Sequence, residues 1–183
     1  MSELKKHEDS GQMQRMVEEQ KGRNLWGEIF KLRDEQREKA KKSVWMVRGD
    51  ELEWQNNEQG IMRWYLHPFL DVPCIKTQML FVQKIPPGSR SGRIHHPGGM
   101  VVFAWEGRGY TVIDGQKFHW EKNDVVQFPM KLTGVTVQHF NSDPENEALL
   151  ICCEANFFQM AGVDRGSVLE QLEVSPDYVK KAT

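Results

Sequence analysis

The side chains best suited to chemistry in this chain are three histidines, His95, His96 and His139. They lie at the two ends of the segment from Gly88 to Asn141, in which short apolar runs alternate with turn signals such as Asp114-Gly115. Neutral imidazoles bind transition metals, and their reference pKa near 6.5 also suits a general base. Because strands far apart in sequence become neighbours in a closed sheet, we predict that these two ends meet in one pocket.

Side-chain alternation decides which histidines share that pocket, because residues two apart on a strand face the same side. If His96 points inward, Ile94 does too and His95 points outward. If Val137 points inward, His139 does as well. Undistorted strands therefore predict a pocket that holds His96 and His139, with Ile94 and Val137 as its apolar lining.

Two imidazoles make a weak site for a divalent ion, since catalytic zinc and iron sites normally have three protein ligands. A β-bulge beside Pro97 would turn both His95 and His96 inward. His95, His96 and His139 would then form a site suited to iron, zinc, nickel or copper. Two other interpretations stay open: His96 and His139 are hydrogen-bonded barrel residues, or one of them is a general base without a metal.

The elements that must position these residues are short strands, which indicate an all-β domain over residues 44–160. Residues 1–43 are rich in charge and carry one apolar stripe, which predicts a helical arm with helices over about 11–19 and 25–42. We expect Asn24 to be the N-cap of the second helix. Residues 161–183 are expected to contain one short helix and a tail, from the spacing of four apolar residues (Val168, Leu169, Leu172 and Val174).

The composition excludes several classes of protein. A length of 183 residues suits one domain with an extension, and the net charge of −2 argues against a nucleic-acid partner. The sequence begins without the apolar stretch of a signal peptide and contains no run of about 20 apolar residues that would span a membrane. We therefore expect a cytoplasmic protein whose cysteines are reduced.

Two sets of residues form two short sequence motifs, one in the first part of the segment from Gly88 to Asn141 and one in the second part. The first set is His96, Glu106-Gly107, Gly109-Tyr110 and Asp114-Gly115, and the second is Asp124, Pro129, Gly134, His139 and Asn141. Over roughly residues 62–158 the chain resembles the cupin superfamily, and within it the single-domain cupins related to gentisate dioxygenase. The resemblance implies a double-stranded β-helix, also called a jelly-roll barrel, with an N-terminal helical extension.

The sequence departs from that pattern at the metal ligands. The first motif of such cupins reads Gly-Arg-His-Arg-His, and here Ile94 stands at its first ligand histidine. Met100 stands where many cupins carry a ligand glutamate, and Val137 where the third ligand is usual. Of the four positions that hold metal ligands in the consensus, only that of His96 still carries the consensus residue.

The resemblance implies a metal-dependent, dioxygenase-like enzyme with Fe(II) that acts on a phenolic or carboxylated aromatic compound. Arg93 and Gln138 would orient this substrate, Trp105 would stack on it, and the protein would be a homodimer. The alternative is a cupin without a metal that binds a small molecule or assembles with another protein. A metal-free lyase or isomerase would use His96 or His139 with Glu154.

Overall fold

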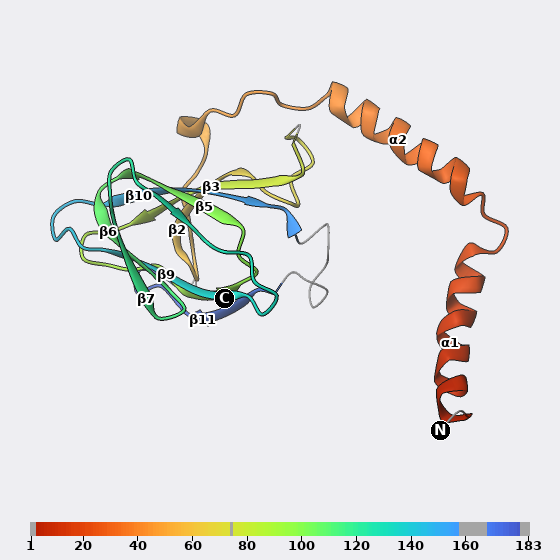
Figure 1. Ribbon diagram of the computed structural model, residues 1–183. Coiled ribbons are helices and arrows are strands. Elements are labelled where there is room, and N and C mark those ends of the chain that lie inside the picture. Colours follow the sequence, from red (N-terminus) through yellow and green to blue (C-terminus); the bar gives the residue numbers. More distant parts are fainter. Residues whose placement is uncertain (1–2, 74, 158–167, 180–183) are drawn as a thin grey trace. The chain divides into compact units, whose positions relative to one another are not determined.

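The computed structural model describes residues 3–73, 75–157 and 168–179. The chain divides into two compact units, residues 1–43 and 44–183, and the division falls where the charge-rich arm was expected to end. Figure 1 shows two helices in the first unit and the β-strands in the second.

The first unit consists of two helices, α1 (Glu3–Gln20) and α2 (Leu25–Lys41). The expected helix over 25–42 is confirmed, and the expected helix over 11–19 lies inside a longer α1. Asn24 caps α2 as expected, because its Oδ1 accepts a hydrogen bond from the Gly27 amide at 3.0 Å. No residue of α2 is buried, and Trp26 on its apolar stripe is 70% exposed.

The described part of the second unit consists mainly of strands, with a short 3-10 helix, η1 (Gly49–Glu51), ahead of the first strand. The strands are β1 (Gln55–Asn57), β2 (Gly60–Leu66), β3 (Gln78–Ile85), β4 (Arg93–His96), β5 (Met100–Glu106), β6 (Arg108–Ile113), β7 (Gln116–Glu121), β8 (Val125–Gln127), β9 (Val135–Asn141), β10 (Ala148–Ala155) and β11 (Glu170–Glu173). The expected all-β domain is therefore confirmed.

These strands form two antiparallel sheets that face each other (Figure 1). One sheet has the order β1-β2-β3-β10-β5-β8, and the other has the order β11-β4-β9-β6-β7. Strands β4 and β9 are neighbours although β5 to β8 lie between them in sequence. This pairing joins the two ends of the histidine-bearing segment.

Turn chemistry fixes the register of the second sheet. Asp114 and Gly115 have positive φ angles of 49° and 83° and join β6 to β7, as the Asp-Gly hairpin signal predicts. Gly107, with φ of 87°, joins β5 to β6 and lets the chain pass from one sheet to the other.

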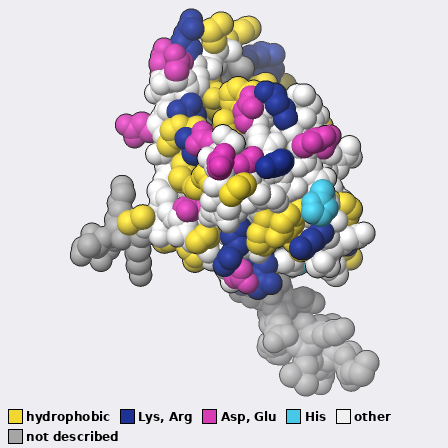
Figure 2. All heavy atoms as spheres, turned by 90° about the vertical axis from the view of Figure 1, so that its left-hand side faces the viewer, with side chains coloured by type: hydrophobic (Ala, Val, Ile, Leu, Met, Phe, Trp, Pro, Cys, Tyr) yellow, Lys and Arg dark blue, Asp and Glu magenta, His cyan; other side chains and the backbone are white. Residues whose placement is uncertain are grey.

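The hydrophobic core lies between the sheets. Val102 and Leu150 contribute from one sheet, and Val135 and Val137 from the other, each no more than 2% exposed. The outer face shown in Figure 2 carries basic and acidic side chains next to one another, with hydrophobic side chains between them. None of the helices in the described part of the chain is long and apolar enough to span a membrane.

The helix expected near the C-terminus is wrong for residues 170–173, which form strand β11 instead. Gln171 pairs with Ile94 and Glu170 with His95, so β11 adds an edge to the second sheet. The apolar spacing of Leu169 and Leu172 suits a helical turn, but the unpaired backbone of β4 offers hydrogen bonds that outweigh this local preference. Residues 161–167 and 180–183 of the expected C-terminal segment lie outside the described residues, as do residues 158–160 at the end of the expected all-β domain.

Candidate functional site

A cavity of about 640 Å³ lies between the two sheets. Both His96 on β4 and His139 on β9 line it, and Ile94 and Val137 line it beside them. This arrangement confirms the prediction from side-chain alternation. Most of the remaining lining is apolar or aromatic, as in many small-molecule sites.

The central feature of the cavity is a contact between His96 and Glu154. The Nε2 atom of His96 lies 2.5 Å from Oε2 of Glu154, and the two side chains are only 2% and 5% exposed. Glu154 extends from β10, so the contact links the two sheets. A carboxylate in such surroundings requires a hydrogen-bonding partner, and His96 supplies it.

The proton of His96 has a defined position. The Gly98 amide donates a hydrogen bond to Nδ1 of His96 at 2.9 Å, so Nδ1 carries a lone pair. In the neutral ring the proton is therefore on Nε2, which donates to Glu154. A backbone amide thus fixes the tautomer of the histidine that holds the carboxylate.

His139 has a different environment, without a carboxylate partner in the described part of the chain. Its Nδ1 lies 2.8 Å from the Thr111 hydroxyl, which accepts a hydrogen bond from Trp120 Nε1 at 3.0 Å. Since Thr111 already accepts from Trp120, its own proton is free to be donated to Nδ1 of His139. Burial lowers the pKa of His139 to about 4, so the ring is neutral at pH 7 with its proton on Nε2.

Phe128 contacts both histidines. Its ring lies 6.3 Å from that of His96, edge to face, and 5.8 Å from that of His139, stacked. Phe128 is 3% exposed and lines the same cavity. The two imidazoles are therefore held around one aromatic ring.

The expected inward rotation of His95 is wrong. Strand β4 pairs with β9 without a bulge, matching His95 with Thr136 and His96 with Val135. His95 consequently faces away from the cavity, and its Nε2 lies 2.8 Å from the Thr133 carbonyl. Regular alternation therefore prevents His95 from joining His96 and His139.

The side chains around the cavity do not fit a metal ion of the expected kind. A metal-binding histidine normally donates its second ring N–H to an acceptor, whereas Nδ1 of His96 receives a hydrogen bond from Gly98 and Nε2 carries the proton. Met100 and Val137 are apolar at consensus ligand positions. Within the described residues, no three histidine, cysteine or acidic side chains converge as a metal site. The expected ligand set for Fe(II), zinc, nickel or copper is thus not formed.

The three residues expected to contact substrate lie elsewhere. Arg93 forms an ion pair with Glu173 of β11 at 2.8 Å. Gln138 alternates to the opposite face of β9 from His139 and donates to the Ser91 carbonyl at 3.0 Å. Trp105 faces outward from β5 and is 46% exposed. In each case strand alternation or a neighbouring partner turns the side chain away from the cavity.

Two further ionisable residues line the cavity, Glu154 and His67. Glu154 follows Leu150 and Cys152 on the inward face of β10, so strict alternation along this apolar strand was the signal that would have identified it. His67 packs against Trp64 with ring centroids 4.8 Å apart, and burial lowers its pKa.

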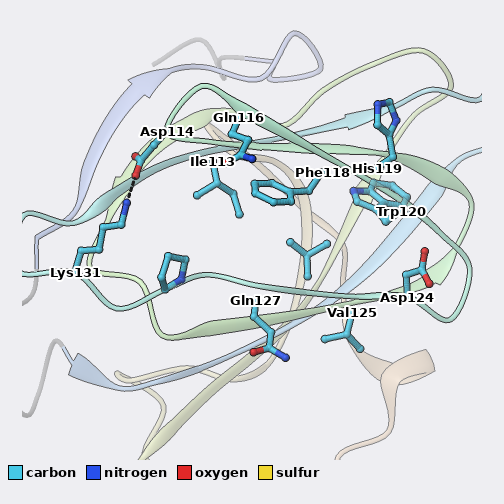
Figure 3. Close-up of a pocket in the computed structure, with 12 residues that line it drawn as sticks. Ile113, Asp114, Gln116, Phe118, His119, Trp120, Asp124, Val125, Gln127 and Lys131 are labelled. Carbon is cyan, nitrogen blue, oxygen red and sulfur yellow. Dashed lines mark hydrogen bonds and ion pairs between the residues drawn. The ribbon is translucent and has the colours of Figure 1, made fainter.

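A second pocket of about 400 Å³ lies beside β7 and β8, the edge strands of the two sheets (Figure 3). Ile113 and Phe118 point toward the gap between the strands, whereas His119 points away from it, as alternation along β7 predicts. Asp114 and Lys131 form an ion pair at its rim, 2.6 Å apart. This pocket lacks a buried ionisable pair among the residues described, so the cavity between the sheets is the better candidate site.

The sequence matches no known family model and no curated protein. Among solved structures, an oxalate decarboxylase superposes with a TM-score of 0.53 at 15% identity, over 71% of this chain and 32% of the other. A salicylate 1,2-dioxygenase from Pseudoaminobacter salicylatoxidans gives 0.47 at 16% identity, over 61% of this chain and 28% of the other.

A cupin-like protein from Thermotoga maritima gives a TM-score of 0.48 at 19% identity, over 72% of this chain and 90% of the other. The chain spans about a third or less of the decarboxylase and dioxygenase chains. At these identities the likeness concerns architecture, and it agrees with the two facing antiparallel sheets. The domain that follows Ser43 therefore has the cupin fold.

Proposed function

We propose that the cavity binds a small organic carbonyl compound and moves a proton on it without a metal, as an isomerase or a lyase does. The observation that carries this proposal is the contact between His96 and Glu154 inside an apolar cavity. Buried ionisable pairs that line a cavity are characteristic of functional sites.

Glu154 is the base in this proposal. Its Oε2 accepts the hydrogen bond from His96, while its Oε1 forms no hydrogen bond within the described part of the chain. Since Glu154 lines the cavity, that second oxygen is available to a ligand. His96 is a positioning residue, because it holds the carboxylate through the proton that the Gly98 amide confines to Nε2.

His139 supplies the complementary group. Its Nδ1 is engaged by Thr111, and its Nε2 makes no hydrogen bond to any described residue. With a pKa of about 4 the ring is neutral, so Nε2–H serves as a hydrogen-bond donor to a carbonyl oxygen. A neutral imidazole donor stabilises an enolate oxygen without first giving up its proton.

The step follows from these roles. The Glu154 carboxylate removes a proton from the carbon next to the carbonyl, and the electron pair of that C–H bond moves into the enolate. His139 donates its hydrogen bond to the enolate oxygen. Return of the same proton to a different carbon gives an isomer. In a lyase, the enolate electrons instead form a carbon–carbon double bond, and the β-leaving group departs with the electron pair of its own bond to carbon.

A second candidate is a ligand-binding protein without chemistry. It is supported by the fact that the contact between His96 and Glu154 joins β4 to β10 across the two sheets, which is also what a structural pair would do. A dioxygenase step has no place in either candidate, because the described residues do not form the ligand set for its metal. The homodimer and the cytoplasmic location stay predictions.

The test is catalysed exchange of the protons next to the carbonyl of 4-cyclohexylcyclohexanone in D2O, followed by proton NMR. We expect the protein to accelerate exchange above buffer and Glu154→Gln to lower the rate by about 10²–10⁴-fold, because glutamine keeps the size but not the basicity. Glu121→Gln, on the exposed face of β7, should retain the rate. Equal exchange by the Glu154→Gln variant, or none by the native protein, would overturn the proposal in favour of binding alone.

A further inference from the structure

The charge of the cavity lining restricts what can bind. Glu154 is its only acidic side chain, and no lysine or arginine lines it among the described residues. Burial lowers the pKa values of both His67 and His139, which disfavours the cationic form of each ring. An anionic ligand would therefore lose its hydration beside the Glu154 carboxylate, without a lysine or arginine to pair with among the described lining residues.

The apolar part of the lining favours a hydrocarbon frame. Trp64 and Phe81 pack with centroids 4.6 Å apart on one side of the cavity, and Phe128 lies beside the histidines. A cationic ligand would neutralise the carboxylate that the proposed reaction needs as a base. The lining and the proposed step together favour an uncharged ligand.

A second polar position lies far along the cavity from Glu154. Gln83 lines the cavity and is 3% exposed, and its Nε2 donates to the Gln59 carbonyl at 2.8 Å. Its Oε1 forms no hydrogen bond to any residue that the structure describes. An amide oxygen that lines a cavity without a hydrogen-bond partner can accept a hydrogen bond from a ligand hydroxyl.

The register of β3 against β10 gives the spacing of the two polar positions. Glu154 lies opposite Met79, and Gln83 is four residues further along β3, opposite Leu150. At about 3.3 Å per residue, the two positions are about 13 Å apart along the strand. A ligand that reaches both must be elongated.

We infer that the substrate is an uncharged, elongated hydroxyketone with a saturated or aromatic hydrocarbon frame. Its carbonyl end lies between Glu154 and His139, and its hydroxyl end donates to Oε1 of Gln83. This inference rests on the proposed function for the orientation of the carbonyl end. Its preference for an uncharged far end follows from the lining itself.

The probes are four ketones that differ only at the far end: 4-cyclohexylcyclohexanone and its analogues with a hydroxyl, a carboxylate or an ammonium group at the 4-position of the second ring. Binding is measured by isothermal titration calorimetry at pH 7. We expect the hydroxyl compound to bind about 2–10-fold tighter than the unsubstituted one, from one hydrogen bond. Both charged analogues should bind at least about tenfold more weakly than the hydroxyl compound.

Two variants assign the effect. Gln83→Met should remove the advantage of the hydroxyl compound over the unsubstituted ketone, whereas Gln127→Met on β8, outside the cavity, should retain this advantage. Tightest binding of the carboxylate or the ammonium compound, or a hydroxyl advantage that survives Gln83→Met, would overturn the inference. The proposed reaction is tested separately. If it does not occur, proton exchange will be absent, while the order of affinities of the four ketones will still hold.

Discussion

The cavity between the sheets and the second pocket, beside β7 and β8, each have a close contact between an acidic and a basic side chain. The two contacts differ in how far they are exposed to solvent. In the cavity, His96 and Glu154 lie 2.5 Å apart and are almost fully buried. At the rim of the second pocket, Asp114 and Lys131 lie 2.6 Å apart (Figure 3), but their side chains are 39% and 47% exposed. Water solvates the exposed Asp114 and Lys131 side chains whether or not they form an ion pair. The buried Glu154 carboxylate, in contrast, depends on His96 for a hydrogen bond. The comparison shows that burial, and not distance, separates a candidate active site from a surface ion pair.

The largest effect is expected from His96→Ala. This change leaves the Glu154 carboxylate buried without its partner, and we expect a loss of about 3–5 kcal/mol in the free energy of unfolding. Urea denaturation at pH 7 measures it. His95→Ala is the matched control, since His95 lies next in sequence but faces away from the cavity. Similar losses in the two variants would break the contrast between a histidine inside the cavity and one outside it.

A pH-dependent effect is expected from His139. Burial lowers its folded pKa to about 4, while the unfolded chain titrates near 6.5, so between these values the unfolded state binds more protons. The contribution of His139 to stability is therefore full above pH 6.5 and falls as the pH drops toward 4, by about 3 kcal/mol. Urea denaturation at pH 7 and pH 4.5 should show a smaller loss in His139→Gln than in the native protein. The exposed His119→Gln variant should follow the native protein, and equal losses in all three would contradict the buried, neutral state of His139.

The smallest effect is expected from Lys131→Ala. The Asp114 carboxylate keeps its hydrogen bond from the Thr136 amide, so removal of the lysine should cost less than about 1 kcal/mol. Urea denaturation at low and high salt measures this change. A loss close to that of His96→Ala would show that the ion pair of Asp114 and Lys131 is coupled to the fold, and the distinction between the two regions would no longer hold.

Much of the fold could be predicted from local signals. The turn at Asp114-Gly115, the alternation on β4 and β9 and the cap at Asn24 are properties of a few neighbouring residues, and each was confirmed. Strand β11 could not be predicted in this way, because its hydrogen bonds are supplied by β4, more than seventy positions earlier in the sequence. Local propensity alone therefore favoured a helix there.

The site was predicted only in part for a similar reason. His96 and His139 belong to strands whose alternation is regular, so their shared face could be inferred. The contact of His96 with Glu154 depends on the packing of one sheet on the other, which alternation does not specify. Arg93 was expected to hold a substrate, but its partner Glu173 lies on the strand that was expected to be a helix.

Gly98 connects the backbone to the chemistry proposed for the cavity. It has a φ angle of 87°, and a Cβ at this position would overlap the Pro129 carbonyl oxygen, so only glycine is accommodated. The same residue provides the amide that decides which nitrogen of His96 is protonated. A residue without a functional side chain therefore helps to set the acid–base properties of the cavity. A mutant library that varied only the reactive side chains would miss this residue.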